Sequence, residues 1–429
     1  MANLLLLAIV AGCGSDAGTT AGDARQPVDA TVGVGASTGV GASSGAPVYP
    51  QARAYTEAPL EQPLPLPAYL SPSFYRPTGT LITRVSDAAA FGTDERVLKH
   101  EYSRRAVWNA DGSKLMLALS YPAWILDASN YGSWRLHDVP SEPLWSNLDP
   151  DAIFGLTGNA FVRYSIASRS TTVLRVFDGY RQLSIGGGEG VQSDDDRYVA
   201  LIGRRTGGVD VLVYDRATDA VGTLAFDRAT APNADIDWVG VSPSGRFLVV
   251  KYDFPPPGVV PGFQVYDRAS LQLLRTVLPG SFSHSDMGYD AAGREVLVAA
   301  AAGSPAIVAV RLADGVVQPM LSADAIGPNV HVSCRNRLRP GWCYFGTYAD
   351  PGADAAYLSR SVFGLRLDGS ERVERFSPAF FADAPLDLAY ERQAWAVPDP
   401  TGARVLFASD WGDPGVNARV NVFVVEAVR

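Results

Sequence analysis

The feature that most constrains the fold is a hairpin signature that recurs along the chain. In its clearest copy, over residues 235–253, alternating polar and apolar residues lead into the turn Ser242-Pro243-Ser244-Gly245, and an apolar run follows. Alternation, a glycine-containing turn and then branched apolar side chains are typical of a β-hairpin. Further copies of the turn occur at residues 109–112, 193–196, 290–293 and 399–402, with weaker copies at 149–151 and 339–341.

The spacing of these turns indicates how the hairpins assemble. The seven turns recur roughly every 40 to 60 residues, which is the period expected of propeller blades. Each hairpin is followed by another apolar strand and turn, as at residues 213–216, 265–268, 308–311 and 365–369. Two hairpins per repeat make a four-stranded sheet, and sheets arranged radially close into a ring. The sequence therefore predicts an all-β fold, a seven-bladed β-propeller of four-stranded antiparallel blades, over residues 78–429.

Residues 1–77 differ from the repeats. A short apolar run at residues 4–10 precedes Ala11-Gly12-Cys13, a triplet that resembles a bacterial lipobox, and this run is too short to span a bilayer as a helix. We expect residues 1–12 to be a signal peptide and Cys13 to be lipidated; the alternative is an apolar terminus with an unmodified cysteine. Residues 13–46, nearly all small or polar, then form a flexible tether. The proline-rich residues 47–77 are expected to form an extended segment against the first blade.

Charge and the residues after Cys13 limit the partners and the location. A net charge of -9 argues against a nucleic-acid partner, because the acidic chain repels a polyanion at long range. No long amphipathic helical pattern is present, which leaves the lipid as the membrane contact that we expect. Gly14 and Ser15 lack the aspartate that commonly retains lipoproteins at the inner membrane, so we expect an outer-membrane or extracellular bacterial protein. We expect a monomer whose partner is a polysaccharide or an envelope protein.

Polar residues recur at the start of the predicted inner strands. Because the inner strand of every blade lines the central channel, these residues should ring one mouth of that channel. The substrate-binding candidates at these positions are Glu189, Asp235, Asp237, Glu391 and Gln393. The same alignment places Tyr102, Arg104, His284, Asp286, His331 and Cys334 around the mouth.

The last two cysteines allow three interpretations. With Cys13 lipidated, Cys334 and Cys343 can form a disulfide in an oxidising compartment. Alternatively, His284, His331 and Cys334 meet from adjacent blades and hold a structural zinc ion. The fourth zinc ligand is then Asp286 or Cys343. The third interpretation is that all these residues are simply buried and hydrogen-bonded.

A second group of candidates could be catalytic. His100, Tyr102 and Arg104 offer a base, a phenol and a guanidinium just before the first inner strand. Tyr180 and Arg197 lie on blade segments that can face the same mouth. The alternative is a solvated loop in which Tyr102 is packed and the arginines are exposed. The chain has no Gly-x-Ser-x-Gly elbow and no His-Glu-x-x-His helix, which argues against serine hydrolases and common metalloproteases.

The hairpins at residues 242–246 and 398–410 resemble the repeats of TolB-type bacterial propellers, and this likeness covers most of residues 78–429. Among enzymes with such repeats, the chain resembles polysaccharide lyases of the oligogalacturonate and ulvan types. The resemblance implies β-elimination at a uronic acid, which needs a cation for the carboxylate, a base and an acid. His100, Tyr102 and Arg104 could fill these roles. Those lyases carry a glutamine and a histidine near the inner strand of the last blade. This chain has the glutamine, Gln393, but Ala394-Trp395-Ala396 follows it and the histidine is missing.

Two functions therefore remain open from the sequence. One is a β-eliminating lyase that acts on a uronic-acid-containing polysaccharide. The other is a non-catalytic cell-envelope propeller that binds a glycan or a protein partner. A lyase requires His100, Tyr102 and an arginine to converge within about 6 Å around an open groove, whereas a binding module does not.

Overall fold

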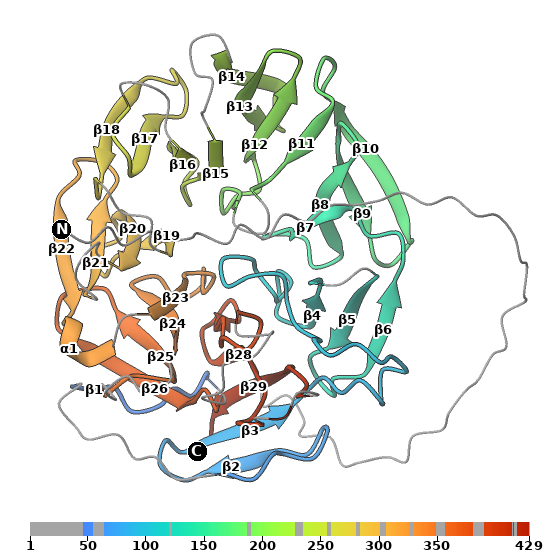
Figure 1. The fold of residues 1–429 in the computed structure, drawn as a ribbon, viewed down its shortest axis with the longest axis vertical. Coiled ribbons are helices and arrows are strands. Elements are labelled where there is room, and N and C mark those ends of the chain that lie inside the picture. The colour runs from blue at the N-terminus through green and yellow to red at the C-terminus, as the bar shows by residue number, and fades with distance from the viewer. Residues whose placement is uncertain are drawn as a thin grey trace, which may run out of the picture. The chain divides into compact units, whose positions relative to one another are not determined.

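The computed structural model describes residues 46–54, 64–119, 122–186, 190–227, 235–254, 259–279, 284–300, 306–326, 329–348, 357–380, 390–413, 415 and 418–428. Their strands form seven antiparallel sheets, which stand around a centre like propeller blades (Figure 1). The predicted all-β, seven-bladed β-propeller is confirmed. The one helix in the described part of the chain is the single turn α1 (Ala323–Ile326). None of the helical structure described is long and apolar enough to cross a membrane.

Blades 2 to 5 have four strands each, in sequence order across the sheet. Blade 2 contains β7 (Ser141–Trp145), β8 (Ala152–Thr157), β9 (Ala160–Ser165) and β10 (Ser170–Val176). Blade 3 contains β11 (Gln182–Ser184), β12 (Tyr198–Arg205), β13 (Gly208–Asp215) and β14 (Ala220–Asp227). Blade 4 contains β15 (Asp235–Val241), β16 (Phe247–Phe254), β17 (Phe263–Asp267) and β18 (Leu273–Val277). Blade 5 contains β19 (Ser285–Tyr289), β20 (Glu295–Ala300), β21 (Ile307–Arg311) and β22 (Val317–Leu321).

The other three blades vary the pattern. Blade 1 has β4 (Lys114–Leu117), β5 (Ala123–Asp127) and β6 (Ser133–Leu136), and its inner strand is reduced to one bridge between Trp108 and Leu115. Blade 6 has β23 (Asn329–Ser333), β24 (Trp342–Tyr348), β25 (Ser361–Arg366) and β26 (Arg372–Pro378), with β1 (Arg53–Ala54) added at its outer edge. Blade 7 has β27 (Val397–Pro398), β28 (Arg404–Ser409), β29 (Asn421–Ala427), β3 (Thr80–Arg84) and β2 (Ser73–Tyr75).

Blade 7 joins the two ends of the propeller. The N-terminal strand β3 pairs antiparallel with the C-terminal strand β29, with Thr83 opposite Val424, and the two appear as adjacent blue and red arrows in Figure 1. Strands β1 and β2 also pair within blades 6 and 7. The described parts of residues 47–77 thus pair with the last two blades, while Tyr69 also packs against the apolar cluster that contains Leu115 and Trp124 of blade 1. Ring closure explains the strand pairing, because an N-terminal strand completes the last sheet and removes its free edge.

The turn of the β15–β16 hairpin shows why the signature residues recur. Gly245 takes a positive φ of 73°, a conformation that glycine adopts without steric cost. Its N–H donates to the Ser242 carbonyl at 2.7 Å, and the Phe247 N–H donates to the Ser242 hydroxyl at 3.1 Å. These bonds close the turn and set Val241 opposite Leu248 in the ladder. The predicted hairpin at residues 235–253 is confirmed.

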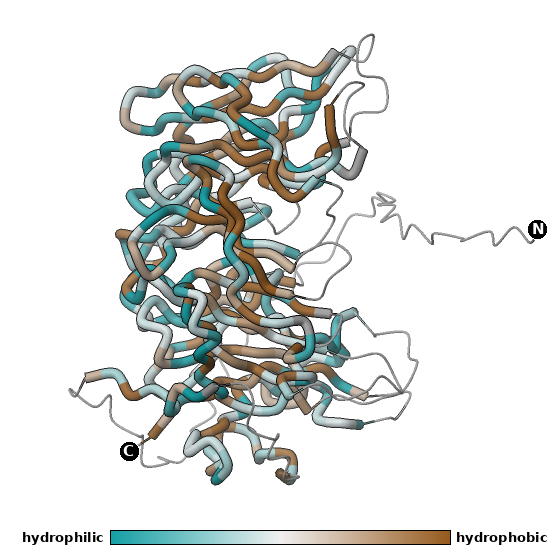
Figure 2. The backbone as a smooth tube through the Cα atoms, turned by 90° about the vertical axis from the view of Figure 1, so that its left-hand side faces the viewer, coloured by the Kyte–Doolittle hydropathy of each residue, from teal (hydrophilic) through white to brown (hydrophobic). Residues whose placement is uncertain are grey.

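The core lies between neighbouring blades. Ile202 and Val213 of blade 3, for example, pack with Val239 and Val250 of blade 4 in one buried cluster. An edge-on view shows apolar segments along the strands, with polar segments at many of their ends (Figure 2). Each sheet is therefore covered on both faces, and the stacked blades supply most of the apolar burial that stabilises the ring.

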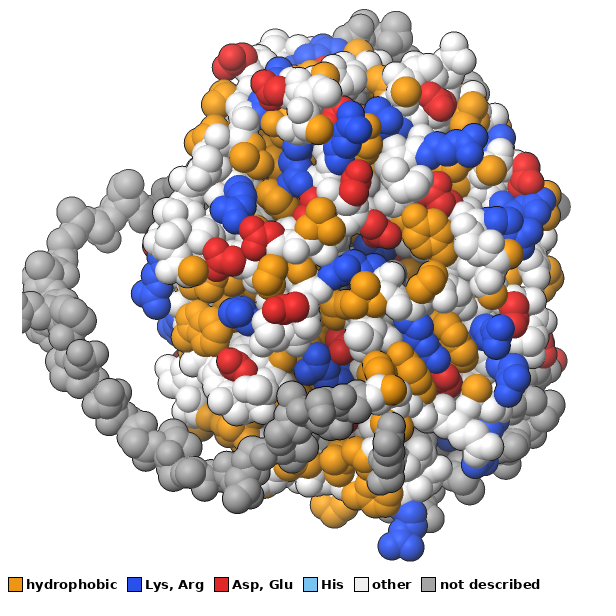
Figure 3. Space-filling view, turned by 180° about the vertical axis from the view of Figure 1, so that it is seen from behind, with side chains coloured by type: hydrophobic (Ala, Val, Ile, Leu, Met, Phe, Trp, Pro, Cys, Tyr) orange, Lys and Arg blue, Asp and Glu red, His pale blue; other side chains and the backbone are white. Residues whose placement is uncertain are grey.

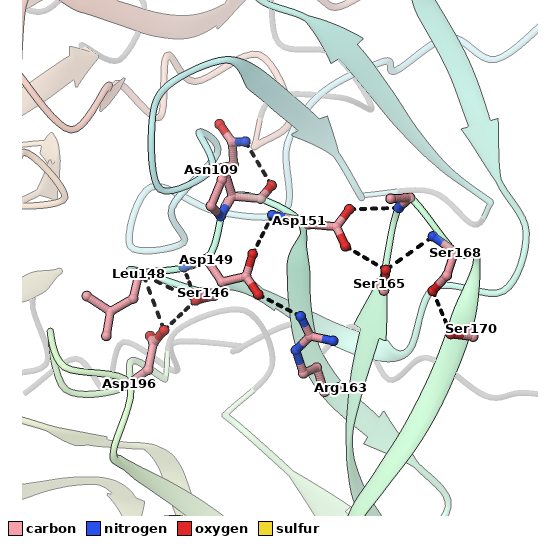
Figure 4. A network of polar contacts seen from close by, with 12 residues as sticks. Asn109, Ser146, Leu148, Asp149, Asp151, Arg163, Ser165, Ser168, Ser170 and Asp196 are labelled. Carbon is pink, nitrogen blue, oxygen red and sulfur yellow. Dashed lines mark hydrogen bonds and ion pairs between the residues drawn. The ribbon is translucent and has the colours of Figure 1, made fainter.

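Polar contacts link blades 1 to 3 at the turns that follow the inner strands (Figure 4). Asp196 of blade 3 accepts hydrogen bonds from the Ser146 hydroxyl and from the Leu148 N–H of blade 2. The Asn109 side chain of blade 1 donates to the Pro150 carbonyl of blade 2 at 2.9 Å. Such satisfied buried contacts fix the register of one blade against the next.

Candidate functional site

The central channel has two mouths with different side chains. The inner strands β15, β19, β23 and β27 run in the same direction, so their starts gather at one mouth and their turns at the other. We call the first the histidine mouth, formed by Tyr102, His284, His331, Gln393 and Trp395. We call the second the arginine mouth, formed by Trp108, Asn109, Asn147, Arg335 and Arg337. Between them, Arg104, Asp286 and Trp238 fill the channel and are each at most 1% exposed.

A hydrogen-bonded chain of four side chains lies at the histidine mouth. Tyr102 Oη is 2.6 Å from Nδ1 of His284 and 3.4 Å from Nδ1 of His331. His331 Nε2 is 2.5 Å from Gln393 Oε1. The two imidazole rings are 4.2 Å apart between centroids. Blades 1, 5, 6 and 7 each supply one of these residues, so ring closure is required to assemble the cluster.

The side-chain carbonyl of Gln393 determines which atoms donate and which accept along this chain of hydrogen bonds. Because Oε1 can only accept, His331 donates from Nε2, and its uncharged ring then accepts at Nδ1. Tyr102 can donate its hydroxyl proton to that nitrogen, and its oxygen then accepts from His284 Nδ1–H. In this arrangement His284 Nε2 keeps its lone pair. The arrangement therefore presents one imidazole nitrogen as a proton acceptor.

Burial keeps the imidazoles of this mouth uncharged. Desolvation, assisted by the Lys251 charge, lowers the pKa of His284 to about 4. Desolvation and the neighbouring His284 hold the pKa of His331 well below its usual range. Desolvation and Lys99 lower the pKa of His100 to about 3. At neutral pH all three rings are neutral, which the hydrogen-bond directions of the chain require.

Residues 99 and 100 hold the loop that carries Gln393. The buried Lys99 Nζ is 2.7 Å from the Glu391 carbonyl, 3.2 Å from the Gln393 carbonyl and 3.1 Å from the centre of the Trp395 ring. His100 Nε2 contacts the Trp395 carbonyl at 2.7 Å. Trp395 has a positive φ of 42°, a strained conformation for a bulky residue that costs about 1–3 kcal/mol. The contacts with Lys99 and His100 offset this strain and position Gln393.

A cation and an aromatic surface flank His284 and His331. Lys251 of β16 forms an ion pair with Asp237 of β15, and both charges act on the pKa of His284. Tyr348, Tyr390 and Trp395 have their ring centroids 5.3, 6.1 and 5.9 Å from that of His331. Tyr390 is 44% exposed and can offer a ring to a ligand. The mouth thus combines a neutral base, an ammonium group and aromatic rings.

The cysteines form a disulfide and do not bind zinc as the sequence alternative supposed. Cys334 and Cys343 are joined, with their Cα atoms 4.4 Å apart. Asp286 accepts from the Cys334 N–H at 2.7 Å and from the Arg335 guanidinium at 2.8 Å, so its oxygens are occupied. Within the described residues, no three His, Cys, Asp or Glu side chains form a group that could hold a metal. The zinc site of His284, Asp286, His331, Cys334 and Cys343 is therefore not supported.

The candidates around His100 are placed differently from expectation. His100 and Arg104 are each 1% exposed, so the alternative of a solvated loop is wrong, and neither side chain can reach a polymer. Arg104 stacks on Trp238 at 3.6 Å and approaches Asp286 at 3.8 Å. Only Tyr102 of this group joins the hydrogen-bonded chain at the mouth, so His100, Tyr102 and Arg104 do not meet around an open groove as that catalytic assignment required.

Two further catalytic candidates lie within blade 3. The Tyr180 hydroxyl donates to Asp210 at 2.7 Å, and the Arg197 guanidinium donates twice to Asp215 at 2.9 and 2.8 Å. Both have structural roles in their own blade.

The structure describes only some of the predicted substrate-binding residues, and it gives them different contacts. Gln393 contacts His331, Asp237 contacts Lys251, and Glu391 contributes its carbonyl to Lys99. Glu189 and the side chain of Asp235 lie outside the described residues, as do Cys13, the expected signal peptide and nearly all of the expected tether. Sequence reasoning missed Lys99, Lys251 and Trp395. Trp395 lies near the start of an inner strand and Lys99 just before His100, whereas Lys251 lies in the second strand of its blade, opposite Trp238, where the sequence offered no signal.

Comparisons with known proteins identify the fold. No protein-family model and no curated protein matches the chain. Oligogalacturonate lyase from Vibrio parahaemolyticus matches with a TM-score of 0.58 and 12% identity, over 84% of this chain and 97% of that one. An oligogalacturonate lyase in complex with manganese matches with a TM-score of 0.58 and 15% identity, over 85% and 97% of the two chains. TolB from Acinetobacter baumannii is also similar, with a TM-score of 0.37 and 16% identity over 65% of each chain.

The manganese of that neighbour raises the question of whether this mouth suits a metal. His284 and His331 both direct Nδ1 to Tyr102 Oη, and His331 uses Nε2 with Gln393. Only His284 Nε2 is left as an uncommitted nitrogen donor in the chain. One nitrogen does not make a metal site, so a resident manganese does not fit these residues as they are arranged. The likeness to the oligogalacturonate lyases agrees with the β-propeller fold and extends no further than the fold.

Proposed function

We propose that the protein is a β-eliminating lyase of uronic-acid-containing polysaccharides, and that the histidine mouth is its active site. The observation that carries the proposal is the hydrogen-bonded chain from Gln393 through His331 and Tyr102 to His284. This chain leaves a neutral imidazole nitrogen ready to accept a proton. The shared fold with oligogalacturonate lyases supports the proposal at the level of architecture.

His284 is the base of the proposed reaction. Its Nε2 takes the proton from the carbon next to the uronate carboxylate, and the electron pair of that C–H bond forms the new double bond as the glycosidic C–O bond breaks. The leaving oxygen takes a proton, which the His284 imidazolium can return. Tyr102 and His331 accept part of the developing positive charge through their hydrogen bonds.

Lys251 is the cation of the proposed reaction. Removal of the proton places negative charge on the uronate carboxylate, and an ammonium group beside it lowers that cost. Lys251 is close enough to His284 to depress its pKa, and Asp237 holds it in place until substrate arrives. The exposed ring of Tyr390 supplies an apolar face against which a sugar ring can pack.

The same proposal includes the location. We place the protein on the outer membrane or outside a bacterial cell, anchored through lipid on Cys13, with polysaccharide as its partner. The Cys334–Cys343 disulfide supports an oxidising compartment, because such bonds are rare in the reducing cytosol. Labelling with a radioactive fatty acid tests the anchor, since Cys13→Ala should then remain unlabelled.

A non-catalytic glycan-binding propeller is the second candidate. The observation in its favour is that Tyr102 is 4% exposed and His331 is 0% exposed, so only His284 and Gln393 of the chain are partly accessible to a ligand. A binding module needs the aromatic rings and the lysine but no proton acceptor. The two candidates therefore differ in whether His284 changes turnover.

The test is the ultraviolet absorbance of the unsaturated product, measured with the full chain on a panel of uronic-acid polysaccharides. His284→Ala should lower the rate by about 100- to 10,000-fold, the usual contribution of a general base. Tyr102→Phe should lower it by about 10- to 100-fold, because the hydroxyl that orients His284 is lost.

Tyr180→Phe is the matched control, since it removes the same hydroxyl from a tyrosine bonded within blade 3. It should keep the wild-type rate. Equal rates for Tyr102→Phe and Tyr180→Phe would contradict the assigned chain. A folded wild type that gives no product on any polymer, but binds one of them, would establish the second candidate instead.

A further inference from the structure

Arg337 at the arginine mouth is a partly desolvated charge that forms no ion pair with the residues that the structure describes. It is half-buried, and burial lowers its pKa. Among the described residues, its guanidinium makes one hydrogen bond, to the Ala110 carbonyl, and no ion pair. Asp194 and Asp196 act on it only from beyond ion-pair distance. Buried charges are normally paired, because losing water without gaining a partner is costly.

Two neighbours of Arg337 also keep unused donors. Arg335 is held by Asp286 and by the Met287 carbonyl through Nε and Nη2, which leaves its Nη1 without a partner in the described part of the chain. Trp108 is 2% exposed, and its indole N–H is buried with no acceptor among the described residues. Arg335, Arg337 and Trp108 line one pocket together with Asn109, Asn147 and Pro400. Two guanidinium groups therefore line this space, and the buried Trp108 indole lies in its wall.

We propose that this pocket is a second binding site, which takes the carboxylate of a small organic acid. A planar carboxylate matches the fork of an arginine, with two parallel N–H···O bonds. Trp108 and the prolines supply an apolar wall for the carbon atoms next to the carboxylate. The enclosed part of this pocket is about 10 Å³, roughly the room that one water molecule needs, so only the carboxylate head enters and the rest of the acid lies toward solvent.

The second site is separate from the histidine mouth. Arg104, Asp286 and Trp238 close the channel between the two mouths. The proposal therefore does not depend on the lyase function. His284→Ala, which should abolish elimination, should bind the acid as the wild type does.

Ligand-observed saturation-transfer NMR on the full chain tests the site. The probes are acetate, D-galacturonate and sulfate, titrated at constant ionic strength. Acetate and galacturonate should both bind in the millimolar range, and sulfate should bind more weakly because it is tetrahedral. Arg337→Met keeps the aliphatic stem but removes the fork, and should weaken carboxylate binding by about 10- to 100-fold.

Arg294→Met is the matched control. It removes the same charge from the same face, where Arg294 already has Asp290 as its partner, and it should leave binding unchanged. Arg337→Lys keeps the charge without the fork and should bind with intermediate affinity, which preserves the test if Arg337→Met fails to fold.

Three results would overturn the proposal. They are no saturable binding of either carboxylate to the wild type, equal binding to wild type and Arg337→Met, and sulfate binding as tight as acetate. Binding of galacturonate but not acetate would still support the site and would identify a sugar acid as its ligand. Binding of both would identify a general carboxylate pocket.

Discussion

The two mouths of the channel are built from opposite ends of the same strands, yet their polar groups are in opposite states. At the histidine mouth the imidazole rings are neutral and are linked to Tyr102 and Gln393 by hydrogen bonds, and the Trp395 indole N–H is the donor of this group without an acceptor among the described residues. At the arginine mouth two guanidinium groups and an indole keep donors that the described residues do not satisfy. The first arrangement is suited to moving a proton, and the second to holding an anion.

The face turned away from the viewer in Figure 1 carries basic and acidic side chains that are intermixed, without a large area of either sign (Figure 3). Local burial decides the chemistry of each mouth, because a charge that has lost its water interacts strongly with its nearest neighbours. Substitution of the buried residues between the two mouths should then have the largest effect on stability.

Asp286→Ala should destabilise the structure at both mouths. Asp286 is fully buried, pairs with Arg335 at 2.8 Å and lies 3.8 Å from Arg104. Removing one partner of a buried ion pair costs about 3–5 kcal/mol. We expect urea denaturation to show a loss of stability of that size. Asp286→Asn, which keeps an acceptor for the Cys334 N–H, should lose less. Equal stability of Asp286→Ala and wild type would refute the central role of this carboxylate.

Replacing Cys334 and Cys343 together by serine should affect the arginine mouth more than the histidine mouth. The disulfide closes the loop that carries Arg335 and Arg337, and its loss should lower the free energy of unfolding by about 2–4 kcal/mol. Well below the melting temperature, we expect acid binding at the arginine mouth to weaken more than elimination at the histidine mouth. Measuring both on the same preparation checks this, and an equal loss in both would argue against independent sites.

Acid should destabilise the histidine mouth. The pKa values of His284 and His100 are lowered to about 4 and about 3, so both stay neutral in the folded protein while the unfolded chain takes up protons below about 6.5. The stabilising effect is thus complete above pH 6.5 and is lost as the pH falls toward 4. Each histidine contributes on the order of 1 kcal/mol per pH unit. Urea titrations at several pH values should show this slope, and His284→Gln should reduce it.

Asp194 should make acetate binding at the arginine mouth weaker as the pH rises. Burial raises the pKa of Asp194 to about 6, against the lowering effect of Arg335 and Arg337, and Glu295 and Asp195 raise it further. Above pH 6 its negative charge opposes a bound carboxylate. Acetate affinity should therefore fall a few-fold between pH 5 and pH 7, by about the strength of one screened charge. Asp194→Asn should bind equally at both pH values; a retained pH dependence would exclude Asp194 as its source.

Much of the architecture could be predicted because the hairpins depend on residues that are neighbours in the sequence. The turn Ser242-Pro243-Ser244-Gly245 and its copies marked the hairpins, since glycine at a positive φ and a period of two are properties of neighbouring residues. The same alignment correctly brought Tyr102, His284, His331 and Gln393 to one mouth. Tyr180 and Arg197, which were suggested separately from that alignment, have their partners across the strands of their own blade.

The sequence by itself determined that this chain forms hairpins in seven repeats and that polar residues stand at the starts of inner strands. Only the tertiary structure decided what those residues do. Tyr102 and His284 are 182 residues apart, and Lys99 is 292 residues from the Glu391 carbonyl that it contacts. Such pairs meet only after β3 closes the ring on β29. The Cys334–Cys343 disulfide, by contrast, joins residues only nine apart and was one of the interpretations that the sequence allowed.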